Sequence, residues 1–355
     1  MKAALYKGPR DVEIIDKPKP VPGPGQAVVK VVYVGICGTD VHSYMHPGII
    51  SPPTIFGHET VGTIDSLGEG VTGFKVGDRV AVGPPGNCGE CHNCLSGRSS
   101  ICIHGFPLTT GITPNTDGGY AEYMLVRNPK KMCIPVPAGM SMEEAVLFDV
   151  MGTSFHGIRY SRFKMGDSVA VLGTGPIGFS AMMLLKLGGA SKVIALVRSE
   201  EKAKLSLEYG ADIAIDITKV QGEALVEKVR SLTGGKGVDV SYECAGGAEP
   251  TQTCLSVTRS GGQVLLIGMS PEPLGVRTAF YGPTEIDLQI TFVYDAAEIA
   301  MIFDFLASGK LPQAKKMVTD IIGMNDVVTK GLERLSKKND QIKILLAPNG
   351  KNGKL

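Results

Sequence analysis

The hydrophobic pattern changes its period part-way along the chain. From about residue 165, short runs of continuous aliphatic residues alternate with stretches of helical periodicity. The runs predict strands at 168–173, 192–197, 213–216, 238–243 and 263–268, and the stretches between them predict helices at 176–187, 200–209, 222–232 and 250–258. Strands that are apolar on both faces and separated by helices predict a parallel sheet covered on both sides.

Specific residues mark the ends of these predicted helices. Pro176 suits the first position of a helix, where its missing N–H costs no hydrogen bond. Ser199 precedes Glu200 and Glu201 and is expected to cap the helix that follows, with the two acids in its first turn. Gly210 suits the position that ends a helix.

The first 150 residues have a different rhythm. Gly and Pro interrupt the sequence often, and apolar runs at 27–34, 59–67 and 79–82 predict strands between turns. This part is therefore expected to be mostly β or α+β. One further helix is predicted at 296–308, after the alternating region ends.

Composition sets the size of the protein and limits its partners. The 355 residues, 43% of them hydrophobic, suffice for about two domains with a sizeable core. The 36 Lys and Arg nearly cancel the 35 Asp and Glu, so a net charge of +1 predicts neither nucleic acid nor a membrane surface as partner. The N-terminus lacks an apolar secretion signal and no apolar run is long enough to cross a bilayer. We therefore expect a cytoplasmic protein, in which clustered cysteines indicate metal or catalysis.

A glycine-rich turn follows the first predicted strand of the parallel sheet and opens a predicted helix. It fits the pattern G-x-G-x-x-G and consists of Gly173, Thr174, Gly175, Pro176, Ile177 and Gly178. The first glycine permits a tight turn, the second lets a pyrophosphate approach the backbone, and the third allows close packing of helix on strand. The N-terminus of the helix offers N–H groups to phosphate. The turn therefore predicts a dinucleotide-binding domain.

The choice of cofactor depends on the end of the next predicted strand. An Asp or Glu there would accept from the ribose 2′-hydroxyl of NAD, but Val197 occupies that position. Arg198 and Ser199 follow it and suit a 2′-phosphate by charge and hydrogen bonding, which favours NADP. The alternative, that Glu200 or Glu201 turns back to the ribose of NAD, stays open.

Four cysteines lie close together in a loop rich in Gly, Asn and Ser. Cys88, Cys91, Cys94 and Cys102 have gaps of two, two and seven residues. Four thiolates this close can complete a tetrahedral shell around Zn²⁺ and stabilise a loop with little core of its own. An iron–sulfur cluster is the alternative, but the bacterial ferredoxin pattern has a three-residue last gap followed by Pro. The spacing favours a structural zinc site.

A second group of possible ligands is spread through the sequence. Cys37 lies in the segment CGTD-x-H, His58 and Glu59 lie in GHE-x-x-G, and Asp149 follows Phe148. Together with the four-cysteine loop and the later glycine-rich turn, in this order, these motifs resemble the zinc-dependent medium-chain alcohol and polyol dehydrogenases. The resemblance covers nearly the whole chain and is much more specific for the superfamily than for the substrate.

The resemblance implies a catalytic zinc site and a proton path. Cys37, His58 and Asp149 would hold the metal, with Glu59 able to approach it as a further ligand. Three protein ligands leave one position of the zinc open for substrate. In the family's pattern the Thr39 hydroxyl takes the proton of the alcohol and His42 passes it towards solvent, while Asp40 fixes the tautomer of His58. An Asp at the third ligand position is similar to bacterial NADP-dependent secondary-alcohol dehydrogenases, although many of those lack the four-cysteine loop.

The resemblance also implies the fold and its division. We expect an α/β protein with a GroES-like, mostly-β catalytic domain over 1–150 and 291–355, which carries both zinc sites. A Rossmann domain with a doubly wound, six-stranded parallel sheet would occupy 151–290, with the active site in the cleft between the two. The family further implies a homodimer or homotetramer, commonly through the edge of the dinucleotide domain near 291–294.

The sequence as a whole predicts a zinc-dependent oxidoreductase. The favoured hypothesis is reversible hydride transfer between a secondary alcohol or ketone and NADP(H), with two zinc ions per chain. Apolar candidates for the substrate pocket are Ile49, Ile50, Phe56, Met151 and Tyr294. The alternative is an NAD-dependent polyol, sugar or threonine-type dehydrogenase on the same scaffold. A nucleic-acid-binding zinc ribbon joined to an inactive Rossmann domain is disfavoured by the balanced charge.

Overall fold

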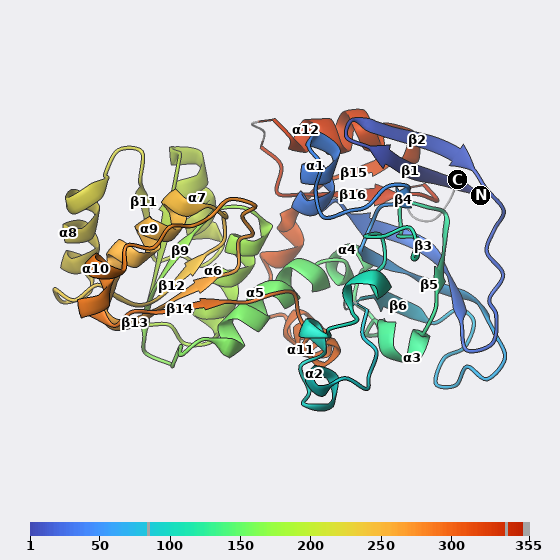
Figure 1. Ribbon diagram of the computed structural model, residues 1–355, viewed down its shortest axis with the longest axis horizontal. Helices are drawn as coiled ribbons and strands as arrows, with labels where there is room; N and C mark the ends of the chain where they lie inside the picture. Colours follow the sequence, from blue (N-terminus) through green and yellow to red (C-terminus); the bar gives the residue numbers. More distant parts are fainter. Residues whose placement is uncertain (84–85, 338–339, 351–355) are drawn as a thin grey trace. The chain divides into compact units, whose positions relative to one another are not determined.

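The chain folds into two compact units. A computed structural model describes residues 1–83, 86–337 and 340–350. Unit 1 consists of Met1–Asp149 and Val293–Leu355, and unit 2 consists of Val150–Phe292 (Figure 1). The chain passes from unit 1 into unit 2 inside helix α5, Phe148–Tyr160. Unit 1 is therefore built from two segments that are far apart in the sequence.

Unit 1 contains two sheets. The three-stranded sheet has the order β2-β1-β4, and the seven-stranded sheet has the order β15-β16-β3-β5-β6-β8, with β7 pairing to β3. The antiparallel pairing of β16 with β3, through Leu345 opposite Gly35, joins the C-terminal segment to the N-terminal strands. The strands are β1 Lys2–Gly8, β2 Asp11–Asp16, β3 Ala27–Gly35, β4 Thr54–Ile55, β5 Glu59–Leu67, β6 Arg79–Val82, β7 Tyr123–Val126, β8 Cys133–Pro135, β15 Val318–Gly323 and β16 Lys343–Ala347.

Aromatic side chains pack against one another in the core of unit 1. Tyr6 and Phe56 stack with ring centroids 4.5 Å apart, and Tyr120 meets Phe56 edge-on. This places the loop before β5 and the loop before β7 against one another. The helices of unit 1 are short, apart from α11. The α-helices are α1 Gly38–Met45, α2 His92–Leu95, α3 Pro129–Met132, α4 Met142–Ala145, α11 Ala296–Ala307 and α12 Glu333–Leu335. The 3-10 turns are η1 Ser99–Ile101, η2 Phe106–Leu108, η4 Ala314–Met317 and η5 Met324–Asp326, and η6 Val327–Leu332 is a π-helix.

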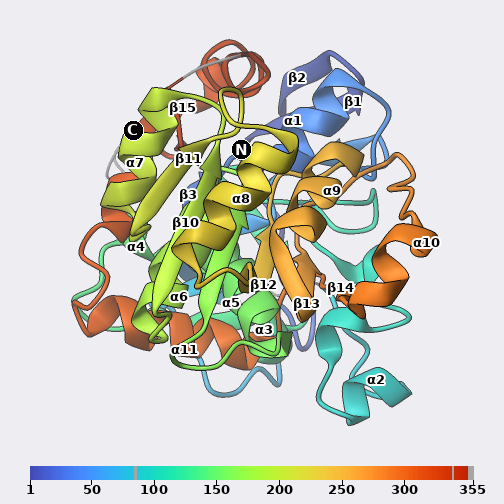
Figure 2. The same ribbon diagram turned by 90° about the vertical axis from the view of Figure 1, so that its left-hand side faces the viewer.

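Unit 2 is a six-stranded parallel sheet with the order β11-β10-β9-β12-β13-β14. Helices α6 and α7 pack on β9, β10 and β11, whereas α9 packs on β12 and β13 beside α8 (Figure 2). The strands are β9 Ser168–Leu172, β10 Lys192–Val197, β11 Ile213–Asp216, β12 Val238–Glu243, β13 Thr258–Leu266 and β14 Asp287–Ile290. The helices are α6 Pro176–Leu187, α7 Glu200–Glu208, α8 Gly222–Leu232, α9 Ala248–Val257 and α10 Thr278–Tyr281, with the 3-10 turn η3 Gly282–Thr284.

The predicted Rossmann topology is confirmed, with some differences at its edge. Strand β13 begins at Thr258, five residues before the apolar run that predicted it, and its pairing with β12 shifts register between Val238 and Val240. The expected sixth strand is β14, whose residues the sequence did not locate because it lacks the continuous aliphatic run of the others. The helix ends follow the sequence signals, since Ser199 accepts from the N–H of Lys202 and Gly210 has a φ of 101°. Within the described residues, no helix has the length and apolar character needed to cross a membrane.

Candidate active site

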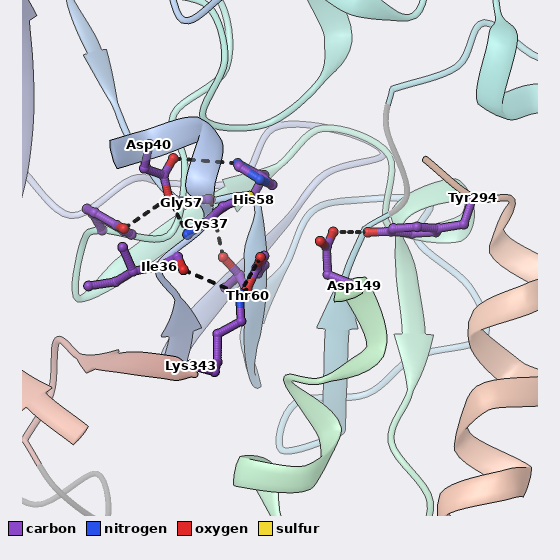
Figure 3. Close-up of polar contacts among 11 residues, drawn as sticks. Ile36, Cys37, Asp40, Gly57, His58, Thr60, Asp149, Tyr294 and Lys343 are labelled. Atoms are coloured by element: carbon purple, nitrogen blue, oxygen red, sulfur yellow. Dashed lines mark hydrogen bonds and ion pairs between the residues drawn. The ribbon is translucent and has the colours of Figure 1, made fainter. Parts of the chain in front are cut away.

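The first part of the site is the start of helix α1. Cys37 is the N-cap residue, and its N–H donates to Oδ2 of Asp40 at 3.0 Å. The same oxygen accepts from the Tyr120 hydroxyl at 3.0 Å. Asp40 is fully buried, and burial raises the pKa of its carboxyl although His58 and the Cys37 N–H lower it. These two donors hold Asp40 in place, with its other oxygen directed towards His58 (Figure 3).

His58 and Glu59 come from the start of strand β5. Nδ1 of His58 lies 3.7 Å from Oδ1 of Asp40, too far for a hydrogen bond, and both atoms are buried without a hydrogen-bond partner. Burial alone would lower the pKa of His58, but Cys37 and Asp40 raise it well above its usual value. The sequence predicted an Asp40–His58 hydrogen bond, and the structure brings the two groups face to face without closing it.

Glu59 is held by a buried lysine that the sequence did not single out. Nζ of Lys343, on β16, lies 2.8 and 2.7 Å from the two carboxylate oxygens of Glu59. The ammonium also donates to the carbonyl of Ile36 at 3.3 Å. Gly35 leaves room for the carboxylate, because a Cβ on that residue would lie 1.8 Å from Oε2 of Glu59. Both ends of the ion pair are almost fully inaccessible.

Asp149 lies in the first turn of α5, where unit 1 ends. Its Oδ2 accepts a hydrogen bond from the hydroxyl of Tyr294, which comes from the other segment of unit 1 (Figure 3). Burial and the nearby Glu59 raise the pKa of Asp149 to about 6, while His58 lowers it. The ring of Tyr294 meets Phe148 edge-on at 6.2 Å. The sequence predicted Asp149 as a ligand but gave Tyr294 only as a pocket candidate.

The donor set fits a metal ion. Cys37, His58 and Glu59 offer ligand atoms within 4.8 Å of one another, and Asp149 lies outside that set in this structure although its charge acts on His58. A thiol, an imidazole and carboxylates are the ligands that zinc takes in proteins. The unpartnered Nδ1 facing Asp40 is the arrangement in which a histidine binds a metal through Nε2. The site contains several acids and one lysine, so it is rich in negative charge. A divalent cation would balance that charge.

The predicted proton path lies on α1. Thr39 is half-buried and His42 is exposed, three residues further along the same helix. Residues three apart lie on one face of a helix, so the two side chains are neighbours there. The ring of His42 is 6.0 Å from that of His46, which extends the polar surface. This order, from half-buried hydroxyl to exposed imidazole, leads outward from Cys37.

The four-cysteine loop forms a second cluster in unit 1. The Sγ atoms of Cys88 and Cys102 are 3.5 Å apart, those of Cys91 and Cys102 3.8 Å, and those of Cys88 and Cys94 3.9 Å. Four sulfurs each about 2.3 Å from a central zinc would be separated by roughly 3.8 Å. All four cysteines are free. Hydrogen bonds from the backbone N–H groups of Cys94 and Ile103 lower the pKa of the Cys91 thiol to about 6, which favours the thiolate that zinc binds.

The glycine-rich turn of unit 2 has the geometry that a dinucleotide needs. Gly173 has a φ of 110°, and a Cβ on it would lie 2.9 Å from the backbone of Cys244. A Cβ on Gly178 would lie 1.8 Å from the carbonyl oxygen of Gly173, so helix and strand approach here. Apart from its chain neighbours, none of the described residues has an atom within 4 Å of a Cβ placed on Gly175. The open space at Gly175, at the N-cap of α6, fits a pyrophosphate.

The end of β10 presents the three residues expected to select the cofactor. Val197 is buried, and Ser199 caps α7 by accepting from Lys202 N–H at 3.2 Å. Arg198 is exposed, and its Nη2 donates to Oε2 of Glu249 at 2.7 Å. The sequence did not identify Glu249, which begins the neighbouring helix α9. Arg198 is thus available to a ligand but has a competing carboxylate beside it.

The apolar pocket candidates differ in their burial and in their packing partners. Phe56 is buried between Tyr6 and Tyr120, Ile50 is buried, and Ile49 is exposed. Met151 is buried and belongs to unit 2, whereas the hydroxyl of Tyr294 reaches Asp149. Phe56 and Ile50 therefore serve the core of unit 1. Hydrophobicity alone could not distinguish a pocket wall from a core residue.

Comparison with known proteins identifies the family. Residues 23–138 match the model of the alcohol dehydrogenase GroES-like domain, and residues 176–308 match that of the zinc-binding dehydrogenases. The chain is 32% identical over 354 residues to sorbitol dehydrogenase of Bacillus subtilis strain 168, covering 98% of both chains. The chain belongs to the zinc-dependent medium-chain alcohol and polyol dehydrogenases. The resemblance drawn from the sequence motifs is thereby confirmed.

Solved structures of this family agree with the fold. The chain superimposes on (2R,3R)-butanediol dehydrogenase from Bacillus subtilis with a TM-score of 0.88 and 28% identity, over 98% of this chain and 99% of that one. A protein of Sinorhizobium meliloti 1021, assigned as a zinc-binding dehydrogenase and solved bound to NADP, gives a TM-score of 0.87 and 28% identity over the same shares. This dehydrogenase is thus an oxidoreductase of small-molecule alcohols that uses zinc and a nicotinamide cofactor.

Proposed function

We propose that the dehydrogenase catalyses reversible hydride transfer between a secondary alcohol or its ketone and NADP(H). The observation that carries this proposal is the group of half-buried Cys37 and His58 with the buried Glu59 in unit 1, where Nδ1 of His58 lies unpartnered opposite Asp40. Such a donor set suits a zinc ion that keeps one position open. Unit 1 is accordingly the catalytic, GroES-like domain and unit 2 the dinucleotide-binding domain, close to the division expected from the sequence.

We assign the catalytic zinc to Cys37, His58 and Asp149, with Glu59 as an exchangeable further ligand. Lys343 supports the secondary role of Glu59, because its ammonium engages both carboxylate oxygens of that residue. When bound, zinc supplies Lewis acidity that stabilises an alkoxide and polarises a carbonyl. Cys88, Cys91, Cys94 and Cys102 would hold a second, structural zinc, giving two per chain.

The protein's own groups would handle the proton. The Thr39 hydroxyl, half-buried at the start of α1, would accept the proton of the alcohol as it releases its own, and the exposed His42 would pass a proton to water. A histidine suits the outer position because an imidazole can both accept and donate a proton. Asp40, fixed by Cys37 N–H and the Tyr120 hydroxyl, orients His58 from behind.

NADP is favoured by the residues after β10. Val197 cannot accept a hydrogen bond from a ribose 2′-hydroxyl, whereas Arg198 and Ser199 offer a guanidinium and a hydroxyl. The S. meliloti relative, solved with NADP, shares the fold. In this proposal Arg198 leaves Glu249 for the 2′-phosphate, and Gly173, Thr174, Gly175, Pro176, Ile177 and Gly178 hold the pyrophosphate.

An NAD-dependent polyol dehydrogenase is the second candidate. It is favoured by the sorbitol dehydrogenase of B. subtilis, which matches the chain along 98% of its length. It is also favoured by Glu249, whose charge beside Arg198 would oppose a phosphate. The two candidates share the zinc site and differ in the cofactor and in the polarity of the substrate.

One assay distinguishes these candidates. The absorbance of reduced nicotinamide is followed with NAD and with NADP over a panel of simple secondary alcohols, polyols and amino alcohols. The proposal expects turnover of simple secondary alcohols with NADP preferred. Strong preference for NAD would contradict the cofactor assignment, and activity confined to polyols or threonine-like substrates would replace it with the second candidate. Thr39→Val, which removes only the hydroxyl, is expected to lower kcat by roughly 10²–10⁴-fold.

We also propose that the enzyme is a homodimer or homotetramer. The support is β14, which is the edge strand of the parallel sheet and carries the exposed side chain of Ile290. An exposed edge strand can pair with its copy through backbone groups that lack a neighbouring strand. Sedimentation of the purified protein measures its mass directly. A monomer at micromolar concentration would contradict this assembly.

A further inference from the structure

Tyr294 joins two segments of unit 1 at the acid proposed to ligate zinc. Its hydroxyl donates to Oδ2 of Asp149 across 145 positions of sequence (Figure 3). Tyr294 is buried and Asp149 is half-buried. The ring packs edge-on against Phe148, the residue before Asp149. Gly83 leaves space for both, since a Cβ on it would lie 2.8 Å from the Phe148 ring and 3.2 Å from the Tyr294 hydroxyl oxygen. The position of the tyrosine hydroxyl is therefore fixed from several sides.

The residue after Tyr294 is tied to the four-cysteine loop. Oδ1 of Asp295 accepts from the hydroxyl of Ser99 and from the N–H of Ser100, both at 2.7 Å. These serines lie between Cys94 and Cys102, so the loop that gathers the cysteines also holds Asp295. Asp295 is in addition the N-cap of α11, and its N–H donates to Oε2 of Glu298 at 2.9 Å. Tyr294 is thus placed between the two clusters of metal-binding residues.

We propose that Tyr294 is a positioning residue of the catalytic zinc site, anchored through Asp295 to the four-cysteine loop. The proposal rests on the function proposed above, in which Asp149 is a zinc ligand. The hydrogen bond from the tyrosine hydroxyl to Oδ2 fixes the orientation in which the Asp149 carboxylate would meet the metal. Partners of this kind orient metal-ligating carboxylates, and loss of such a partner typically weakens metal binding 10–100-fold.

The side chain of Tyr294 permits a clean test. Tyr294→Phe removes the hydroxyl and keeps the ring that packs on Phe148. The matched control is Tyr33→Phe, because Tyr33 is also buried and donates to Oε1 of Glu143 at 2.8 Å in unit 1. Both variants lose one tyrosine–carboxylate hydrogen bond, and only one of them bears on Asp149.

The measurement is zinc release from the holoenzyme into a chromogenic chelator, which resolves a fast and a slow zinc per chain. We expect Tyr294→Phe to accelerate release of the catalytic zinc by roughly 10–100-fold and to leave the structural zinc unchanged. Tyr33→Phe is expected to behave as the wild type. In the cobalt-substituted enzyme, Tyr294→Phe is expected to shift the visible absorption of the catalytic metal, which a loss of stability alone would not do.

A double variant tests whether the effect passes through Asp149. If it does, Tyr294→Phe combined with Asp149→Asn should release zinc no faster than Asp149→Asn alone. Additive effects, or wild-type zinc release from Tyr294→Phe, would overturn the role of Tyr294. A separate result, unchanged zinc retention in Asp149→Asn, would overturn the ligand assignment in the proposed function, whatever Tyr294 does.

The anchor is tested through Asp295. Asp295→Ala removes the acceptor for Ser99 and Ser100 and should accelerate release of the catalytic zinc in the same direction as Tyr294→Phe. Since this change also removes a helix cap, Ser141→Ala is the control, because Ser141 caps α4 of the same unit by accepting from Glu144 N–H at 3.2 Å. Equal zinc release from the two variants would contradict the anchor.

Discussion

Lys343 and Glu59 form a buried ion pair that joins the last strand of the protein to the start of β5. Nζ of Lys343 contacts both carboxylate oxygens at 2.7–2.8 Å, and neither side chain has more than 2% of its surface exposed. Burying two charges away from water costs free energy. Their mutual attraction offsets this cost only when both charges are present and well oriented. The pair therefore holds a buried carboxylate beside Cys37 and His58.

Removing one member of this pair should destabilise unit 1 strongly. Lys343→Met leaves the carboxylate of Glu59 buried without its partner, which typically costs about 3–5 kcal/mol. The free energy of unfolding is measured by urea denaturation. The double variant Lys343→Met with Glu59→Gln leaves no uncompensated charge and should recover part of the loss. A single variant as stable as the wild type would contradict the role of the pair.

Two glycines of the cofactor turn should respond differently to alanine. A Cβ on Gly178 would lie 1.8 Å from the carbonyl oxygen of Gly173, so Gly178→Ala should lower the melting temperature of unit 2. In the described part of the chain, a Cβ on Gly175 meets nothing within 4 Å beyond its sequence neighbours, so Gly175→Ala should fold normally and raise the KM for the cofactor. Melting curves and cofactor titrations check both. Normal cofactor binding by Gly175→Ala would contradict a pyrophosphate at this turn.

Arg198 and Glu249 should set the cofactor preference in opposite directions. Arg198→Ala removes a charged hydrogen bond to the 2′-phosphate and should raise the KM for NADP by roughly 10–100-fold, with little change for NAD. Glu249→Gln frees Arg198 and removes a repelling charge, and should lower the KM for NADP. Glu227→Gln, an exposed acid on α8, is the matched control. Unchanged NADP kinetics in Arg198→Ala would show that this residue is not the selector.

Asp239 should make the stability of unit 2 depend on acidic pH. Burial raises the pKa of this carboxyl, but Arg259 Nε at 2.7 Å and the N–H and hydroxyl of Ser168 at 2.8 Å lower it below its usual value. A carboxyl with a lowered folded-state pKa stabilises the fold above its unfolded pKa, near 4, and this contribution is lost as the pH falls through the folded value.

The variant Asp239→Asn tests this expectation. It should be less stable than the wild type by roughly 1–3 kcal/mol at pH 7. The difference should shrink as the pH falls below about 4, because the wild-type carboxyl becomes neutral once the pH passes through its lowered folded-state pKa. Urea denaturation of both proteins at each pH gives the difference directly and cancels the groups that they share. A difference independent of pH would exclude Asp239 as the cause.

The sequence predicted the sheet of unit 2 well because its signals are local. Aliphatic runs, Pro176, Ser199 and Gly210 each act within a few residues of where they lie. The early start of β13 and the edge strand β14 depend on pairing with neighbouring strands, which no local pattern records. Periodicity therefore located most elements and missed those that tertiary pairing creates.

Residues of the candidate site that lie in sequence motifs could be predicted. Residues that reach the site only through long-range contacts could not. Cys37 and His58 stand in short recognisable segments, and the four cysteines have a spacing of their own. Lys343 meets Glu59 from 284 positions away, and Tyr294 meets Asp149 from 145. A lysine in an apolar strand and a tyrosine before a helix give no local sign of those partners. Only the fold brings them to the site.

The zinc content of the protein with and without Cys37 tests directly whether this residue holds a catalytic zinc ion. The wild-type enzyme should hold two zinc ions per chain, and Cys37→Ala should hold one and lose dehydrogenase activity, because it removes a ligand of the catalytic metal and leaves the four-cysteine loop intact. Cys133→Ala, a buried cysteine outside both clusters, is the control and should keep both ions and the activity. A Cys37→Ala protein that retains two zinc ions, or that still oxidises alcohols, would contradict the account.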